Sequence, residues 1–391
     1  MNERDRALEL LQRIERESLF ASLVLIGESG FVRTVVLGVL RWRSRLDFVI
    51  ETLADRKLKK LDARVVDVLR IGIYQLGWMN VPPHAAVSET VDLAGRYASR
   101  ARGFVNAIMR RASTSLPEPK DDAARLAHPR WLLDRWSRAF GKERALKIAE
   151  ANQELSYPDV LVLDGEAPPD STPSELAPGV ARLKGSTADL DRQHFYPMDE
   201  GSAVVAAVAA TAAEEILDLA AAPGGKSIYM RNRGSRVISN DIAFTRLRPL
   251  RARGMPAVVS DGRRPAFRRR FQTVLLDAPC SATGTIRKSP ELKWRLAEND
   301  LATFAVLQRE LLTSAMDLAG ETIVYSTCSL EPEENDEVVR AVLASRSEFQ
   351  QDDIAALVPE GARRWTDNGV LRLTPESGAD GFTAFLLRRS R

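Results

Sequence analysis

The sequence has few cysteines, and it has no apolar stretch long enough to cross a membrane. Two cysteines in 391 residues cannot build a disulfide framework, and such low usage is typical of a reducing compartment. The longest apolar stretch, Ser202–Ala213, falls short of the roughly 18 residues that a membrane span needs. The first thirty residues mix arginines with acids and lack the apolar block of a signal peptide. We therefore expect a cytoplasmic, globular protein that does not act at a membrane.

Histidines are also scarce, and their spacing does not suit a metal site. His84, His128 and His194 stand far apart in the chain, and all three precede the region where a parallel sheet is expected. Neither a set of metal ligands nor a general base is indicated by this pattern. We predict structural roles for the three histidines and no bound metal.

Positive and negative charges nearly cancel over the whole chain, but not along it. Lys and Arg total 56 against 53 Asp and Glu, a net charge of +3. Residues 231–270 nevertheless contain twelve arginines and only two acids. Such a local excess is typical of a surface that contacts a nucleic-acid backbone, although a solvated helix face with a basic loop is the alternative. The arginines of this cluster are Arg231, Arg233, Arg236, Arg246, Arg248, Arg251, Arg253, Arg263, Arg264, Arg268, Arg269 and Arg270.

Hydrophobic spacing divides the chain into helical and alternating regions. Residues 1–112 show only helical periodicity and predict a helical bundle with its own core. Residues 113–127 are polar and contain prolines, as a linker does. Residues 128–200 begin with a further helical stretch and continue with short apolar pieces, which indicates a small α+β middle region. Residues 201–391 alternate short apolar runs with helix-length segments, so we predict a parallel α/β sheet that binds ligands at the carboxyl ends of its strands.

The first expected strand of the alternating region is followed by small residues. Small side chains let the backbone approach a ligand, and the next helix offers free N–H groups. A P-loop would need its first glycine at position 220, where this chain has alanine. A nucleoside-bearing cofactor instead predicts an acid about 20 residues further on, where Asp241 stands, and Asp261 ends the third strand in a place suited to an adenine edge. The small-residue segment comprises Ala220, Ala221, Ala222, Pro223, Gly224, Gly225 and Lys226.

Both cysteines follow expected strands at this same edge. Cys280 comes after the run TVLLDAP, and Cys328 comes after ETIVYST. A single cysteine is usually a small buried apolar residue, but a thiol at a ligand-binding edge can be a nucleophile. A thiolate that adds to carbon 6 of a pyrimidine makes carbon 5 reactive toward an electrophilic methyl group, and a carboxyl group near ring N3 offsets the developing charge. Asp277, Cys280 and Cys328 supply a carboxyl and two thiols for this chemistry.

Several segments together resemble the RsmB/Sun family of RNA 5-methylcytosine methyltransferases. They are DLAAAPGGKS, ISNDIAFTRL, VVSDGRRP, LLDAPCSATGTIRKSPELKW and VYSTCSLEPEEND, with further likeness at Met198–Ser202 and Asp380–Phe382. Within residues 1–112, the segments VPPHAAVSETVDLA and GFVNAIMRR resemble the NusB-type RNA-binding domain. The resemblance covers nearly the whole chain.

This resemblance implies a cofactor, a reaction and roles for individual residues. S-adenosyl-L-methionine would bind a Rossmann-like class I methyltransferase domain at residues 220–226, Asp241, Asp261 and Asp277. Cys328 would be the nucleophile, and Cys280 would assist breakdown of the covalent adduct. The expected reaction is methyl transfer to carbon 5 of a cytosine in 16S ribosomal RNA, performed by a monomer on naked or partly assembled RNA. A P-loop ATPase and a non-catalytic RNA-binding protein remain the alternatives.

Overall fold

The computed structural model describes residues 2–187 and 190–390, and the chain forms two compact units. The first, the helical unit, contains Met1–Glu154 together with Ile286–Leu296. The second, the sheet unit, contains Leu155–Thr285 and Ala297–Arg391. The structure therefore divides the expected middle region 128–200 at Glu154. Over the described ranges, we find no helix with the length and hydrophobicity needed to span a membrane.

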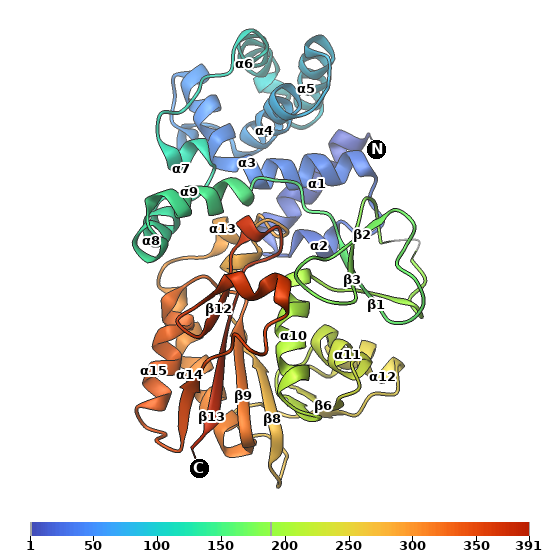
Figure 1. Cartoon of the computed structure of the whole chain (residues 1–391). Helices are drawn as coiled ribbons and strands as arrows, with labels where there is room; N and C mark the ends of the chain where they lie inside the picture. Colours follow the sequence, from blue (N-terminus) through green and yellow to red (C-terminus); the bar gives the residue numbers. More distant parts are fainter. Residues whose placement is uncertain (1, 188–189, 391) are drawn as a thin grey trace. The chain divides into compact units, whose positions relative to one another are not determined.

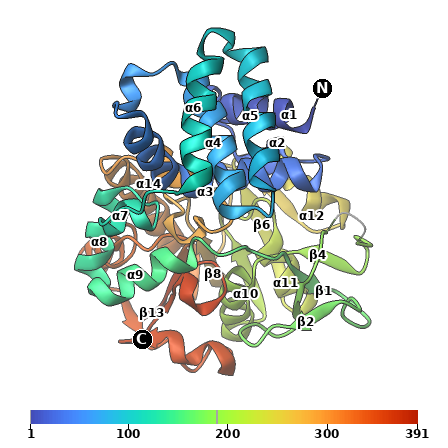
Figure 2. The same ribbon diagram turned by 90° about the horizontal axis from the view of Figure 1, so that it is seen from above.

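The helical unit consists of helices that begin at recognisable caps. Asn2, Ser29 and Asp62 each accept a hydrogen bond from a first-turn N–H group, and Pro83 occupies the first position of its helix. Helices α5 and α6 lie side by side in Figure 2. The elements are α1 (Glu3–Arg16), α2 (Ala21–Val24), α3 (Gly30–Ala54), α4 (Ala63–Trp78), α5 (Pro83–Tyr97), α6 (Arg102–Thr114), α7 (Asp122–Arg125), α8 (Arg130–Phe140), α9 (Lys142–Ala151) and α13 (Leu292–Arg295).

The core of the helical unit forms because apolar residues repeat at helical spacing along α1, α3 and α4. Leu8, Val36 and Leu69 come from these three helices, and each is at most 1% exposed. Helices α3 and α4 approach closely at Gly38, where a Cβ atom would lie only 1.9 Å from Cζ of Tyr74. The expected helical bundle is confirmed, and a glycine sets the spacing of its two central helices.

A segment from late in the sequence completes the helical unit. Helix α13 lies within residues 286–296, and its polar side chains bond to the backbone of the first helices. The Lys293 Nζ donates to the carbonyl of Arg41 at 2.9 Å, and the Trp294 Nε1 donates to the carbonyl of Leu40 at 2.6 Å. Side-chain donors that reach helix carbonyls in this way tie the segment firmly to α3.

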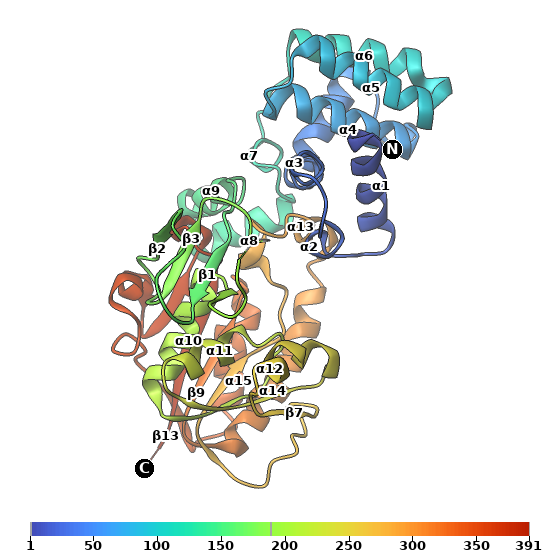
Figure 3. The same cartoon turned by 90° about the vertical axis from the view of Figure 1, so that its right-hand side faces the viewer.

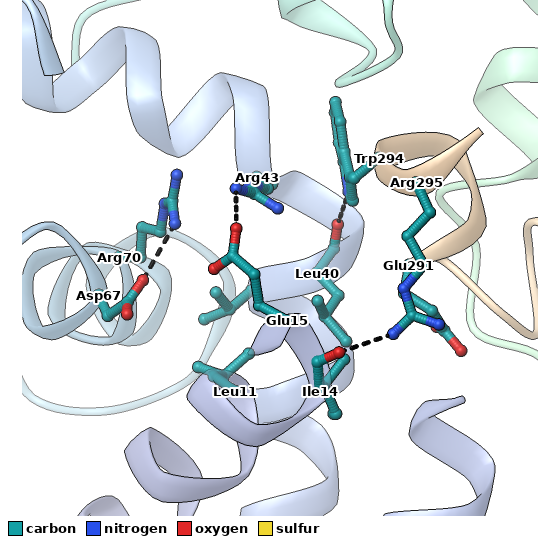
Figure 4. Close-up of a pocket in the computed structure, with 11 residues that line it drawn as sticks. Leu11, Ile14, Glu15, Leu40, Arg43, Asp67, Arg70, Glu291, Trp294 and Arg295 are labelled. Carbon is teal, nitrogen blue, oxygen red and sulfur yellow. Dashed lines mark hydrogen bonds and ion pairs between the residues drawn. The ribbon is translucent and has the colours of Figure 1, made fainter. Parts of the chain in front are cut away.

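Beside this segment lies a cavity of about 170 Å³, drawn in Figure 4. Trp294 borders it together with two ion pairs of the helical unit. Arg43 binds Glu15 at 2.7 Å, and Arg70 binds Asp67 at 3.0 Å. These four charged groups of the cavity wall are thus bonded in pairs, and we assign the cavity no ligand.

The sheet unit begins with a small antiparallel sheet in the order β2-β3-β1-β4, coloured green in Figure 3. The larger sheet of the described chain has nine strands in the order β11-β12-β13-β9-β8-β5-β6-β7, with β10 paired to β13. The strands are β1 (Asp159–Val162), β2 (Ser171–Pro173), β3 (Val180–Leu183), β4 (Phe195–Pro197), β5 (Glu215–Asp218), β6 (Arg236–Asp241), β7 (Ala257–Val259), β8 (Phe271–Asp277), β9 (Ala319–Thr327), β10 (Phe349–Asp352), β11 (Thr366–Asp367), β12 (Val370–Leu373) and β13 (Phe382–Arg389).

Helices cover both faces of the larger sheet, as Figures 1 and 3 show. Successive residues of a strand point to opposite faces. Along β8, Val274 therefore packs in one apolar cluster with Leu312, and Leu275 packs in another with Val205. The first face carries α14 (Asp300–Leu318) and α15 (Asp336–Leu343), and the second carries α10 (Glu200–Ala212) and α11 (Gly225–Asn232).

The sequence predicts strands at the short apolar runs EILDLA, RVISND, PAVVSD, TVLLDAP and ETIVYST. They correspond to β5 through β9, which pair in parallel. The predicted α/β sheet is therefore confirmed. Strand β5 has β6 on one side and β8 on the other, so the strand order reverses at β5. Ligands of such sheets bind at this reversal, beyond the carboxyl ends of the strands.

Candidate active site

The loop after β5 takes a shape that only small residues allow. Gly224 has a φ of +110°, and a Cβ atom there would lie 2.5 Å from Cγ of Leu250. The loop is held to the neighbouring strand because the Ala221 N–H donates to the Asn240 carbonyl at 2.8 Å. Helix α11 begins directly after this loop, so its first N–H groups lie at the strand end.

A cavity of about 270 Å³ lies at this loop. Most of the predicted cofactor residues line it: Ala220, Ala221, Ala222, Pro223, Gly225, Lys226 and Asp277. Its other walls come from Tyr196, Pro197, Met198, Asp199, Ser202, Asp218 and Phe382, which we had not assigned to the site. Four of these residues, Met198, Asp199, Ser202 and Phe382, lie in the segments Met198–Ser202 and Asp380–Phe382. These segments resemble the family, so the sequence did contain an indication of them.

Lys226, which is buried, and Asp277, which is half-buried, form an ion pair in the cavity wall. Their Nζ and Oδ2 atoms lie 2.6 Å apart, and the hydroxyl of Ser326 donates to the other Asp277 oxygen at 2.8 Å. Burial lowers the pKa of Lys226, but attraction to Asp277 outweighs it, so the pKa lies above its ordinary value. The ammonium is therefore charged and already neutralised, whereas a P-loop lysine must reach a phosphate.

Asp218 contributes an acceptor that the protein itself does not use. Its side chain is 1% exposed, and the Ser227 hydroxyl donates to Oδ2 at 2.6 Å. The other oxygen, Oδ1, has no hydrogen-bond partner in the described chain although it is buried. Burial raises the pKa of Asp218 to about 7. An orphaned acceptor beside a cavity fits a ligand that carries donor groups or positive charge, as S-adenosyl-L-methionine does.

Two predicted cofactor carboxylates stand outside the cavity wall that the described residues form. Asp241 accepts bonds from the N–H groups of Ala222 at 3.0 Å and Ala243 at 2.8 Å, so it supports the loop. Asp261 binds the Arg263 side chain at 2.7 Å and its N–H at 2.9 Å. The hydrogen bonds from Arg263 hold the pKa of Asp261 below its ordinary value. Cofactor contact stays a prediction for all of the assigned residues, both those that line the cavity and these two carboxylates with Gly224.

The structure places the two thiols in contact. Cys280 follows β8 and Cys328 follows β9, which is the neighbouring parallel strand. Their sulfur atoms lie 3.3 Å apart, and both side chains are half-buried. The Gly284 N–H also donates to the Cys328 carbonyl at 2.9 Å. The hydrogen bond with Cys328, together with burial, raises the pKa of Cys280 well above its ordinary value, so Cys280 keeps its proton.

The arginine cluster lies mainly on the surface. Eleven of its twelve members are exposed, and Arg253 is half-buried. Arg246 donates to the Ala222 carbonyl at 3.0 Å, which places one basic side chain beside the cavity loop. Others bind acids, as Arg269 binds Glu215 at 2.9 Å. The cluster is thus a solvated basic surface that is partly neutralised by the protein.

The sheet, with its cavity at the strand reversal, is an α/β ligand-binding domain, and the family that it matches makes it an S-adenosyl-L-methionine-dependent methyltransferase. Residues 205–388 match the family described as 16S rRNA methyltransferase RsmB/F, and residues 1–114 match the NusB family. The chain belongs to the ribosomal RNA small subunit methyltransferase B family. The predicted methyltransferase fold and helical NusB domain are confirmed by these matches.

Individual relatives agree with this assignment. The ribosomal RNA small subunit methyltransferase B of Citrobacter koseri is 32% identical, over 91% of this chain and 89% of its own length. The same enzyme of Shigella flexneri serotype 5b is 33% identical, over 81% of this chain and 82% of its own. The crystal structure of PH0851 shares the fold with a TM-score of 0.79 at 21% identity, covering 100% of this chain and 99% of that one.

Proposed function

We propose that this chain transfers a methyl group to carbon 5 of a cytosine in 16S ribosomal RNA through a covalent cysteine–RNA intermediate. The observation that carries the proposal is the pair of thiols 3.3 Å apart at the ends of β8 and β9. Asp277 ends the first of these strands and is bonded to Ser326 of the second. A carboxylate and two thiols are thus gathered at the ends of these two strands, and the carboxylate of Asp277 also lines the cavity.

The proposed chemistry assigns one task to each side chain. Cys328 attacks carbon 6 as a thiolate, and the electron pair of the ring double bond moves to carbon 5. When bound, S-adenosyl-L-methionine supplies an electrophilic methyl group. Asp277 would hold a proton at ring N3, and this proton offsets the negative charge that the attack brings to the ring. Water then takes the carbon 5 proton, the electrons of that C–H bond restore the ring double bond, and Cys328 leaves as a thiolate. Cys280 assists this release by donating a hydrogen bond from its S–H group to the leaving sulfur.

The cavity wall indicates how the chain would hold its cofactor. We assign this role to Ala220, Ala221, Ala222, Pro223, Gly224, Gly225 and Lys226, with Asp241, Asp261 and Asp277. The small loop residues admit a ligand to the backbone, and Lys226 and Asp277 fix one wall. Asp218 adds the acceptor that is free for a donor on the ligand.

We further propose that the RNA is bound by the NusB-like region and by the arginine cluster. A target base must leave its stack before methyl transfer, and this costs less in single-stranded or partly unfolded RNA. Naked or partly assembled 16S RNA should therefore be the better substrate. Arginine–phosphate contacts position the RNA without reading its sequence, and they weaken steeply with salt. The enzyme would act as a cytoplasmic monomer.

Replacing each cysteine tests the proposal. Cys328→Ala should abolish methylation and covalent RNA capture, while cofactor affinity stays within about threefold, because the thiol serves the transition state rather than cofactor binding. Cys280→Ala should leave attack intact and accumulate a protein–RNA adduct that survives denaturing gels. Methyl incorporation, adduct gels and calorimetric cofactor binding measure these effects.

Two outcomes would contradict the assignment. Near-normal turnover of Cys328→Ala would show that it is not the nucleophile. An adduct in Cys328→Ala, together with none in Cys280→Ala, would require the two roles to be exchanged.

A further inference from the structure

A buried carboxylate connects the two loops that carry the cysteines. Glu334 ends the short 3₁₀ helix Pro332–Glu334, and its side chain is fully buried. The Ser281 N–H donates to Oε1 at 2.8 Å, and the Gln308 Nε2 donates to the same oxygen at 3.0 Å. The hydroxyls of Ser281 and Ser329 both donate to Oε2. Across the described residues, the two oxygens thus have four neutral donors.

The position of these donors in the sequence is the informative point. Ser281 directly follows Cys280, and Ser329 directly follows Cys328. One carboxylate therefore binds the residue next to each thiol, across two loops that are 48 residues apart in sequence. Desolvating a carboxylate is costly, and it is tolerated only where hydrogen bonds use the oxygen lone pairs. Here every lone pair has a donor, so the carboxylate is a rigid junction between the loops.

We propose that Glu334 is a positioning residue that fixes the separation of the two thiols. This rests on the proposed function, in which both thiols act on the same base. Glu334 does not touch the reacting atoms; it acts through Ser281 and Ser329. If the loops slid apart, Cys280 would no longer reach an adduct on Cys328, and a displacement of about 1 Å can cost about a hundredfold in rate.

The bonding pattern separates positioning from a purely electrostatic effect. In Glu334→Gln, the amide oxygen can still accept from the Ser281 N–H and from Gln308. The amide NH₂ then meets the two hydroxyls, which can turn and accept because a hydroxyl is both donor and acceptor. Glutamine therefore keeps the junction without the charge, whereas alanine removes both. A role that depends on charge would be lost equally in the two variants.

The experiment compares the full-length protein with Glu334→Gln and Glu334→Ala. Oxidation by diamide, without RNA or cofactor, forms a Cys280–Cys328 disulfide at a rate that reports the thiol separation, read by mass spectrometry. We expect Glu334→Ala to slow this oxidation about tenfold or more and to lower kcat about a hundredfold, with the KM for RNA and the cofactor Kd changed less than about threefold. Glu334→Gln should stay within about threefold of the unmodified protein throughout.

If Glu334→Gln and Glu334→Ala lowered the oxidation rate and kcat equally, the proposal would be overturned in favour of a charge effect. Unchanged oxidation and kcat in Glu334→Ala would overturn it outright. If Glu334→Ala does not fold, Ser329→Ala can replace it, because it removes only the hydrogen bond from Ser329 to Glu334. This variant should slow the oxidation and lower kcat, and an absence of both effects would also refute the proposal. Because the oxidation rate needs no RNA, it tests Glu334 even if Cys328→Ala shows that the catalytic roles are wrong.

Discussion

Each unit of the molecule buries a lysine, and the two lysines differ in what they are bonded to. In the sheet unit, Lys226 lies 2.6 Å from Asp277 and its pKa is raised, because the carboxylate outweighs the effect of burial. In the helical unit, Lys293 donates to the carbonyl of Arg41. Burial and the positive charge of Arg41 lower the pKa of Lys293 well below its ordinary value. One lysine is a charged group at a ligand cavity, and the other is a structural hydrogen-bond donor whose charged form is disfavoured by its surroundings.

The two lysines show that the bonding partner of a buried lysine, rather than the motif that contains it, indicates its role. Both lysines belong to segments that resemble the family, PGGKS and SPELKW. The sequence alone therefore does not show which of them takes part in function. The partner decides the function: a carboxylate holds a charge in place for chemistry, and a carbonyl alone does not compensate a charge. Breaking each contact separately tests this distinction.

The largest effect should come from Lys226→Met. This change leaves Asp277 without its cation in the cavity wall, so we expect methyl transfer to fall about a hundredfold and the free energy of unfolding to fall by about 2 kcal/mol, less than for a fully buried pair because Asp277 is partly solvated. Methyl incorporation and urea unfolding measure the two quantities. If Lys226→Met kept methyl transfer within about threefold of the unmodified protein, Lys226 would be no more important for the reaction than Lys293.

The pH dependence of stability should be opposite for the two lysines. The pKa of Lys293 is lower in the folded chain than in the unfolded chain. At pH values between the folded pKa and about 10.4, the unfolded chain therefore binds a proton at Lys293 that the folded chain does not bind. Lys293 therefore makes stability rise with pH in this window, by at most about 1.4 kcal/mol per pH unit. The raised pKa of Lys226 gives stability that is full below 10.5 and lost as pH rises through the higher folded value.

Urea unfolding from pH 7 to 10 measures this difference. Lys293→Met should be at least as stable as the unmodified protein at pH 7, and the two should converge as pH rises. A gap between them that widens with pH would show that Lys293 is charged in the folded state. Lys226→Met serves as the matched control, since its loss of stability should stay constant over the same range.

The smallest effect should be that of Lys293→Met on catalysis. Lys293 does not line the cofactor cavity in the described chain, and its bond goes to a helix carbonyl. Turnover and cofactor affinity should therefore stay within about twofold. A larger loss of turnover with intact folding would mean that helix α13 has a direct part in the reaction.

The parallel strands were predictable because each is a short apolar run that ends in a turn. The segment around α13 was not, because Glu291 and Lys293 are residue types that normally face solvent, and they are buried here. Their partners lie some 250 residues earlier, as Arg41 does for Lys293, and a local pattern cannot reveal this pairing. Strand β13 is a similar short apolar run, but a local pattern cannot show that it pairs antiparallel with β9, which lies far from it in the sequence.

The residues of the candidate site likewise fall into those that the sequence could predict and those that it could not. Residues 220–226 and Asp277 could be placed at one edge, because glycines, small residues and strand ends follow local rules. The cavity positions of Tyr196 and Phe382 could not, although Phe382 lies in a segment with family likeness. Both reach the cavity from β4 and β13 and depend on how distant elements pack. The junction at Glu334 was equally hidden, because a glutamate in the acidic run EPEEND reads as solvated.

The segment Ile286–Leu296 also has a consequence for biosynthesis. The chain leaves the helical unit after Glu154, contributes to the sheet unit, and returns at Ile286. A ribosome that adds about 5–20 residues per second therefore takes roughly 7–28 s to go from Glu154 to residue 296, which ends the returning segment. Until then the carbonyls of Leu40 and Arg41 lack their Trp294 and Lys293 partners. The nascent helical unit should thus stay loosely folded and sensitive to protease until residue 296 leaves the exit tunnel, and the two units should mature together rather than in sequence.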